Sequence, residues 1–294
     1  MSHRASRIRA CDAAPASRQG AGDATHRLGR LAVASLHAEL VCAPKPGLVT
    51  PFDCGSHDDM DAGTFYRSLF ALRGYFHAIA QAGMADAEFE TLRSLGLSAE
   101  AAMQRATDGI NTHRGAIFSL GLLTASAARC RRQAPAAPPS AEAVCRGVMQ
   151  WADALLTAPL DARSHGQRAV RAHRIAGVRE QAAAGYPILR QVAVPALRQA
   201  QAWGLEREAT LVHTLMTLIA VVDDLNLLHR GGARGLALAQ ASAQAFLARG
   251  SVRQPGWRAQ VDAIAGTFVA HRLSPGGSAD LLACAWFLVQ QEAL

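Results

Sequence analysis

Aspartates gather in two short segments that could hold a metal ion or move a proton. The chain has only 23 acidic residues in 294, and the first segment is SHDDMD, residues 56–61. A helix is predicted over residues 56–76, on which Asp58 and Asp61 would share a face. Like charges this close repel unless a divalent cation or the His57 imidazolium compensates them. A simple helix start, capped by serine and favoured by aspartate at the dipole, explains the same residues.

The second acidic segment is DDLNLLHRGG, residues 223–232. It follows a strongly apolar stretch that predicts one buried helix over residues 206–228. Carboxylates beside a buried apolar stripe are costly unless they are paired or bind a metal. Asp223 and Asp224 therefore become candidate oxygen ligands for Mg²⁺. The alternative is an ion pair from Asp223 through Asn226 to Arg230.

Glycine pairs mark two places where the backbone can approach a phosphate. One pair ends the predicted helix that carries the second acidic segment. The other pair leads into a C-terminal helix with a predicted serine cap. Free N–H groups at a helix start bind phosphate, although an ordinary turn and cap would have the same sequence. Asp280 in that first turn would repel a bare anion, so a bridging metal is expected there. The candidate phosphate contacts are Gly231, Gly232, Gly276, Gly277 and Ser278.

Cationic side chains are placed beside these segments by rigid or capped backbone. Pro44 and Pro46 stop the first predicted helix and hold Lys45 in a loop that would present it to a substrate. The stretch NTHRG, residues 111–115, begins another predicted helix and brings His113 and Arg114 together. An ordinary helix start accounts for this second feature equally well.

The elements that must position these residues are predicted to be helices. Alanine and leucine dominate and aromatic residues make up 5% of the chain, a composition that favours helices over strands. We expect an all-α fold: a disordered extension at 1–24, then one bundle-like catalytic domain at 25–294 with its site on loops. A Pro/Ala segment at 133–140 is predicted to connect helices across the surface. Further helices are expected at 141–156, 165–185, 194–203, 236–247, 261–268 and 278–291.

Charge and cysteine usage narrow the class of protein. The net charge is +7, but the arginines are spread along the chain without interleaved aromatic residues, which favours a polyphosphate substrate over nucleic acid. Unpaired cysteine spacing and the lack of a long apolar run predict a cytoplasmic protein outside the membrane. A non-catalytic helical module that binds nucleotide or nucleic acid stays an alternative. A prenyl-diphosphate enzyme is disfavoured, because DDMDA and DDLNL both fail its D-D-x-x-D pattern.

Six motifs in one order resemble the triphosphoribosyl-dephospho-CoA synthase family. They are PKPGLV (44–49), GSHDDMD (55–61), NTHRGAIFSLG (111–121), SHG (164–166), DDLNLLHRGG (223–232) and LSPGGSADLLA (273–283). The similarity runs from about Leu28 to the C-terminus. Two departures stand out. Arg114 replaces the usual lysine, which keeps the charge but not its shape. The acid at Glu180 falls one residue earlier than the family pattern.

The resemblance implies an all-helical enzyme that joins ATP to 3′-dephospho-CoA and releases adenine. Its product would pass to a phosphoribosyl-dephospho-CoA transferase and an acyl-carrier subunit, of malonate decarboxylase in preference to citrate lyase. Glycosyl transfer and a triphosphate call for carboxylates, a base, a proton donor, cations and Mg²⁺. The expected metal ligands are Asp58, Asp61, Asp223 and Asp224, and the expected catalytic groups are Asp58, Asp61, Asp223 and His113. Substrate contacts are assigned to Lys45, His57, Arg114 and Arg230 together with the glycines and Ser278.

Overall fold

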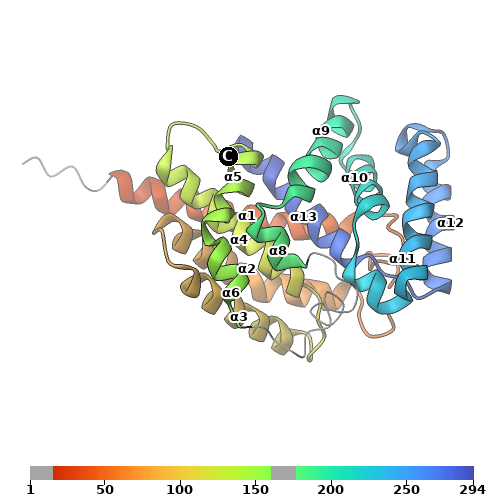
Figure 1. Cartoon of the computed structure of the whole chain (residues 1–294), viewed down its shortest axis with the longest axis horizontal. Coiled ribbons are helices and arrows are strands. Elements are labelled where there is room, and N and C mark those ends of the chain that lie inside the picture. The colour runs from red at the N-terminus through yellow and green to blue at the C-terminus, as the bar shows by residue number, and fades with distance from the viewer. Residues whose placement is uncertain (1–15, 160–176) are drawn as a thin grey trace, which may run out of the picture.

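Helices form every regular element in the part of the chain that the computed structural model describes, residues 16–159 and 177–294 (Figure 1). The all-α prediction is confirmed. The N-terminal half contains α1 (Ala16–Val41), α2 (Ala62–Met84), α3 (Phe89–Ala106), α4 (Arg114–Gln133), α5 (Ala141–Gly147), the 3₁₀ turn η1 (Val148–Trp151) and α6 (Ala152–Thr157). The C-terminal half contains α8 (Val178–Ala183), the π-helical η2 (Leu189–Ala193), α9 (Val194–Ala202), α10 (Arg207–Val221), α11 (Leu225–Ala248), η3 (Ser251–Arg253), α12 (Trp257–Ala270), α13 (Gly276–Gln290) and η4 (Gln291–Ala293).

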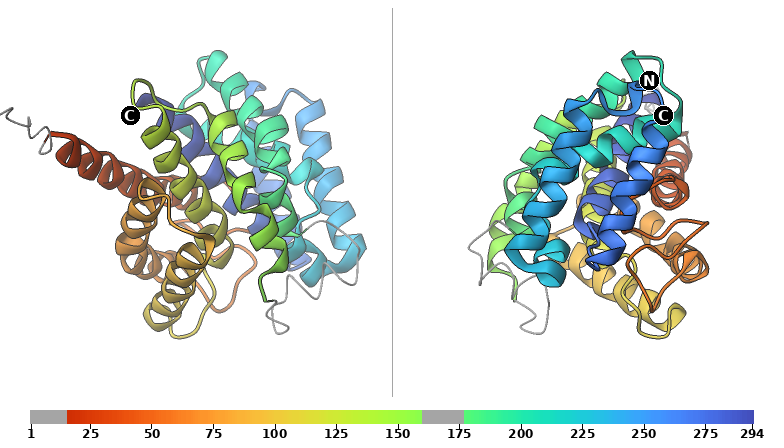
Figure 2. Two further views of the ribbon diagram at one scale, coloured as in Figure 1. Left: turned by 60° about the vertical axis from the view of Figure 1, so that its left-hand side comes forward. Right: turned by 90° about the vertical axis from the view of Figure 1, so that its right-hand side faces the viewer.

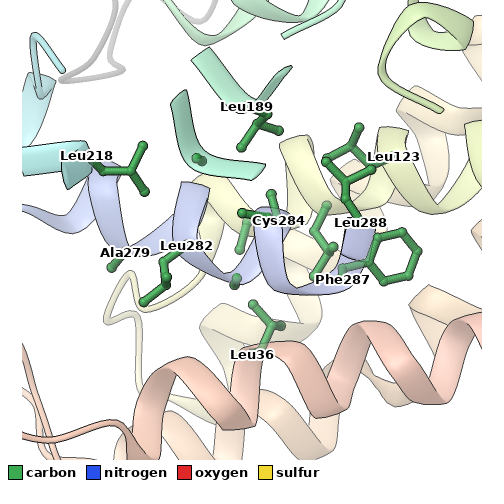
Figure 3. Packing of buried hydrophobic residues seen from close by; sticks show 14 of the residues in the cluster. Leu36, Leu123, Leu189, Leu218, Ala279, Leu282, Cys284, Phe287 and Leu288 are labelled. Atoms are coloured by element: carbon green, nitrogen blue, oxygen red, sulfur yellow. The ribbon is translucent and has the colours of Figure 1, made fainter. Parts of the chain in front are cut away.

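Helix α13 runs through the centre of the molecule and organises the core. Its residues are apolar on nearly every face, as expected for a helix that is enclosed by others. Figure 3 shows its side chains meeting residues from α1, α4, η2 and α10, among them Leu36, Leu123, Leu189 and Leu218. Because one central helix contacts both halves of the chain, it fixes the N-terminal loops relative to α10 and α11.

Small residues let α1, α2 and α4 pack closely in the N-terminal half. A side chain at Gly83 of α2 would overlap the backbone of Ala125 in α4. The buried Tyr75 hydroxyl donates a hydrogen bond of 2.7 Å to the carbonyl oxygen of Ile117, across the same helix pair. The ends of α2 and α4 that carry the 55–61 and 111–121 motifs are therefore set rigidly against each other.

Several predicted helix boundaries are wrong, and the capping residues explain the largest differences. The first helix begins at Ala16, so residues 16–24 are helical; residues 1–15 lie outside the described part. Residues 56–61 form a loop, and α2 begins only after Asp61, whose side chain caps it. The predicted helix over 206–228 is broken at 222–224, where Asp224 caps a new helix, α11. Helix α3 was not predicted.

The Pro/Ala segment crosses the surface between α4 and α5. Ser140 caps α5 by accepting a hydrogen bond of 3.1 Å from the Ala143 N–H. The C-terminal turn holds the segment in place, because the Gln291 side chain donates to the Pro139 carbonyl oxygen at 2.7 Å. The segment thus joins neighbouring helices that pack on the same α13 core.

No single helix among the described residues is long and apolar enough to cross a membrane, although α10 and α11, bent by 57°, meet the length and composition test as a pair.

Candidate active site

Arg230 joins three segments that are far apart in the sequence. Its guanidinium donates hydrogen bonds to the carbonyl oxygens of Ser56 at 2.8 Å and Arg272 at 3.2 Å. Its other terminal nitrogen lies 3.0 Å from Nδ1 of His57. The loop before α2, the first half of α11 and the loop before α13 therefore meet at one arginine. In the right-hand view of Figure 2, the loop before α2, in orange, lies next to the blue C-terminal helices.

The loop before α2 is fastened directly to the loop before α13. The Ser56 hydroxyl donates to the Leu273 carbonyl oxygen at 2.6 Å, and Nε2 of His57 lies 2.9 Å from the Ser274 hydroxyl. Gly47 makes this contact possible, because its φ is +67° and a side chain there would overlap the Leu273 carbonyl. These contacts explain why glycine and small hydroxyl residues recur in both loops.

The hydrogen bonds of His57 define its tautomer. Arginine can only donate, so Nδ1 of His57 accepts from Arg230 and Nε2 carries the hydrogen that is donated to Ser274. Burial and the Arg230 charge lower the pKa of His57, while the Asp59 carboxylate, 3.7 Å from Nδ1, opposes them. His57 is therefore a neutral imidazole near pH 7, locked between two loops.

Asp224 ties the start of α11 to the start of α13. It is 1% exposed, and burial raises the pKa of its carboxyl group. One oxygen accepts from the N–H groups of Asn226 and Leu227 at 2.9 and 3.4 Å. The other accepts from the N–H and hydroxyl of Ser278 at 2.7 and 3.0 Å. Both oxygens are thus used within the protein.

The glycines around these helix starts differ from their predicted roles. Helix α13 begins at Gly276, so Ser278 is not its cap; its polar groups bind Asp224 instead. Gly277 is backed by the same Asp224 carboxylate, which lies about where a side chain at Gly277 would be. Gly231 and Gly232 do not end α11, which continues to Ala248 through a kink at Gly232, where φ is 60° and ψ is −164°. Because of this kink, the first half of α11 runs in a different direction from its second half.

The other predicted acids lie on the surface of this cluster. Asp58, Asp61 and Asp223 are exposed, and the last two immediately flank helices and do not lie within them. Asp61 accepts hydrogen bonds of 2.8 Å from the Thr64 N–H and hydroxyl, which lower its pKa. The predicted shared helical face of Asp58 and Asp61 is wrong, because residues 56–61 are not helical. Asp223 precedes α11, so it does not share a helix with Asn226 and Arg230, and the Arg230 side chain binds Ser56, Arg272 and His57.

Lys45 is buried, contrary to the prediction that its loop would present it. It is 3% exposed, and its ammonium donates to the carbonyl oxygen and side chain of Glu39 at 2.7 and 2.6 Å. A buried ion pair of this kind requires good hydrogen-bond geometry to offset its desolvation. The pair fixes the end of α1 against the loop that carries the 44–49 motif.

His113 and Arg114 stand at the start of α4 with different surroundings. The His113 ring is buried, its Nδ1 lies 2.7 Å from the Ser68 hydroxyl, and its Nε2 has no hydrogen-bond partner among the described residues. Burial, with a smaller contribution from Lys45, lowers the pKa of His113 to about 3. Arg114 is partly exposed and pairs with Glu100 at 2.9 Å.

Asp280 in the first turns of α13 lies directly against the start of α4. A side chain at Gly115 would overlap its carboxylate, which accepts a hydrogen bond from the backbone of Ala116. Burial and the nearby charges of Glu39 and Asp224 raise the pKa of Asp280 well above its usual range. A carboxyl group with a raised pKa is a candidate proton donor.

Comparison with known proteins gives a consistent result. A family model described as ATP:dephospho-CoA triphosphoribosyl transferase matches residues 25–294. The chain belongs to this family. A probable 2-(5''-triphosphoribosyl)-3'-dephosphocoenzyme-A synthase from Acinetobacter calcoaceticus is 38% identical over 268 residues, covering 90% of this chain and 91% of that protein. Proteins with the same name are similar in Citrobacter koseri (38% over 271 residues, 88% and 89% covered) and Albidiferax ferrireducens (36% over 285 residues, 94% of both). No solved structure matches the chain.

Family membership agrees with the motif resemblance, and five of the six motifs lie among the described residues. Four of these segments are joined by the contacts above, at 44–49, 55–61, 223–232 and 273–283, and Asp280 links 111–121 to them. The SHG motif at 164–166 and most of the helix predicted there lie outside the described residues. The motifs do not indicate Glu39, and they indicate Asp280 only as a charge that would repel an anion. The burial around these two residues depends on contacts between distant segments, which the motifs do not show.

Proposed function

We propose that this member of the family joins ATP to 3′-dephospho-CoA and releases adenine, giving 2′-(5″-triphosphoribosyl)-3′-dephospho-CoA. The family match over residues 25–294 and the shared name of the relatives support this reaction. The observation that carries it in the structure is the convergence at Arg230 of segments around residues 56, 230 and 272. A cation, exposed carboxylates and helix starts gather there, as a polyphosphate substrate requires.

The chemistry exchanges one bond at the ribose of ATP. The bond between C1 of the ribose and the adenine nitrogen breaks, and a bond forms between C1 and the 2′-oxygen of dephospho-CoA. A proton leaves the 2′-hydroxyl and one reaches adenine, so a base and an acid are needed. Positive charge develops at C1, which favours carboxylates near the ring. Asp58, Asp61 and Asp223 are exposed and keep their predicted roles as base or ring-facing acids.

The environments of the titratable groups favour Asp280 as the proton donor. The lowered pKa values of His57 and His113 make both imidazoles neutral near pH 7. Burial, with the nearby charges of Glu39 and Asp224, raises the pKa of Asp280, which favours the protonated form of its carboxyl group. Asp280→Asn keeps the shape but cannot release the proton. We expect it to lower kcat and to remove the alkaline limb of the pH profile, whereas a profile identical to that of the wild type would exclude Asp280 from this role.

Mg²⁺ would neutralise part of the triphosphate charge. No group of three or more His, Cys, Asp or Glu side chains among the described residues forms a ready metal cage. Magnesium sites commonly use one or two carboxylates together with substrate phosphates, so exposed Asp58, Asp61 and Asp223 suit this smaller role. Asp224, with both oxygens bonded inside the protein, suits it less well. Arg230 and Arg114 would face the phosphates as cations.

The direct test incubates the purified full-length chain with ATP and dephospho-CoA and measures free adenine by chromatography. We expect adenine only when both substrates and Mg²⁺ are present. The matched variants are Arg230→Gln and Arg234→Gln, two exposed arginines on α11 of which only the first joins the loops. Adenine release that is abolished in the first and kept in the second supports the site. Salt-sensitive DNA binding without adenine release would favour the nucleic-acid-binding module instead.

We assign the product to the acyl-carrier prosthetic group of malonate decarboxylase in preference to citrate lyase, which rests on motif resemblance alone. The product would be consumed by a phosphoribosyl-dephospho-CoA transferase that modifies the acyl-carrier subunit. Gene neighbours that encode decarboxylase subunits would support this branch. Neighbours that encode citrate lyase subunits would overturn it.

A further inference from the structure

A cavity of about 340 Å³ lies between α9, α10, η3 and the C-terminal end of α11. None of the candidate active-site residues lines it. Its polar wall is formed by Gln199, Trp203, His213, Thr217, Ser251 and Arg253. Ligand sites commonly occupy about 300–1,000 Å³, so this cavity has room for a small ligand.

The mouth of the cavity carries an unneutralised cation held on an aromatic ring. The Arg253 guanidinium carbon lies 5.0 Å from the centre of the Trp203 ring, and Trp203 is 36% exposed. No ion pair involves Arg253 among the described residues, and none of the residues that line the cavity is Asp or Glu. A guanidinium held over an indole ring keeps its N–H groups available for an acid group of a ligand.

The inner wall is a histidine held in a fixed orientation. The His213 ring lies 5.0 Å from the Trp203 ring, at an angle of 63°, and its Nδ1 is 2.8 Å from the Ser251 hydroxyl. Ser251 is buried and has a φ of 56°, a left-handed conformation that is unfavourable for a residue with a side chain. Such strained residues cluster at functional sites. Burial lowers the pKa of His213, so the wall is polar but uncharged near pH 7.

We propose that this cavity binds a small anion with a planar body, of the size of a nucleoside monophosphate. The acid group meets Arg253, the planar body packs against Trp203, and the neutral imidazole of His213 with Gln199 and Thr217 offers hydrogen bonds to the body. The proposal concerns a site separate from the candidate active site. It therefore does not depend on the proposed reaction.

Isothermal titration calorimetry of the full-length chain with adenosine 5′-monophosphate tests the proposal. Arg253→Gln removes the cation, and Arg249→Gln is the matched control, because Arg249 is exposed nearby but does not line the cavity. We expect Arg253→Gln to raise the dissociation constant for adenosine 5′-monophosphate at one site at least tenfold, which corresponds to a loss of about 1.4 kcal/mol of binding free energy. Arg249→Gln should bind as the wild type does. Adenosine and inorganic phosphate, each carrying half of the recognition, should bind more weakly.

Three results would overturn the proposal: no saturable binding to the wild type, equal binding by Arg253→Gln, or an equal loss in Arg249→Gln. Inorganic phosphate that binds as tightly as the nucleotide would contradict the role of Trp203. Adenine release by Arg253→Gln, measured with ATP and dephospho-CoA but without added adenosine 5′-monophosphate, should match that of the wild type. The two functions can therefore fail separately, and an unchanged thermal unfolding midpoint shows that the variant is folded.

Discussion

The candidate active site has an inner and an outer layer that treat charge in opposite ways. The inner layer consists of Glu39, Lys45, His113 and Asp280; Glu39 and Lys45 form a buried ion pair, and burial lowers the pKa of His113 and raises that of Asp280. The outer layer is exposed and leaves its carboxylates accessible to a substrate; it consists of Asp58, Asp61, Asp223 and Arg230. In the inner layer the Glu39–Lys45 pair holds the end of α1 and Asp280 is the proposed proton donor. The exposed carboxylates of the outer layer are accessible to phosphate, ribose or metal. Burial thus shifts the pKa values of His113 and Asp280 in the inner layer.

The largest effect is expected from the outer layer. Asp223→Asn should lower adenine release by about 100- to 10,000-fold, the usual contribution of acid–base catalysis. Because the side chain is exposed, the free energy of unfolding should change by less than about 0.5 kcal/mol. Asp262→Asn, an exposed acid on α12, is the control and should stay active. A fully active Asp223→Asn enzyme would remove this residue from the mechanism.

Substitutions in the inner layer should lower the free energy of unfolding. Lys45→Met leaves the buried Glu39 carboxylate without its partner, and breaking such a pair costs about 3–5 kcal/mol. Urea unfolding measures this loss. The double variant Glu39→Leu/Lys45→Met should recover most of the stability, because it removes both charges. A loss of less than about 1 kcal/mol, typical of exposed pairs, would contradict the burial of this pair.

Close packing at the inner layer predicts a smaller loss of stability. In Gly115→Ala the new methyl group meets the Asp280 carboxylate, so the free energy of unfolding should fall by about 1–3 kcal/mol. Gly74→Ala on α2 meets no atom within 4 Å and should stabilise its helix by up to about 1 kcal/mol. If both substitutions stabilise the protein, Asp280 is not held against α4.

The pH dependence of the free energy of unfolding tests whether the His113 ring is buried. The pKa of His113 is lowered from 6.5 to about 3, so the folded state binds its proton more weakly than the unfolded state does. The stability from the neutral ring is present above pH 6.5 and is lost as the pH falls towards 3, with a slope of at most about 1.4 kcal/mol per pH unit. Stability curves of His113→Gln and of the wild type should therefore converge on acidification. Parallel curves for His113→Gln and the wild type would place that ring in water.

The sequence was sufficient to predict the all-α fold, because alanine- and leucine-rich periodic stretches favour helices. The five motifs that lie among the described residues contain segments that contact one another, whereas the local backbone of these segments was predicted less well. The breaks at residues 56–61 and 222–224 were missed, because an aspartate within a helical pattern can continue the helix or cap the next one. In this protein Asp61 caps α2 and Asp224 caps α11.

The burial of side chains was the second property that local sequence patterns did not predict. A lysine between two prolines is typical of an exposed loop, yet Lys45 turns inward because Glu39, six residues earlier, offers a buried partner. The pKa of Asp280 is raised by its burial and by the charges of Glu39 and Asp224, and its carboxylate fits against α4 only where Gly115 carries no side chain. Both facts depend on contacts between segments that periodicity does not encode.

The convergence of these segments is tested most directly by hydrogen–deuterium exchange of the wild-type chain with and without ATP and Mg²⁺. We expect ATP to slow exchange together in residues 47–61, 223–232 and 273–280, while amides of α5 and α6 exchange unchanged. Protection confined to one of these segments, or found only elsewhere in the molecule, would contradict a single polyphosphate site built from all three.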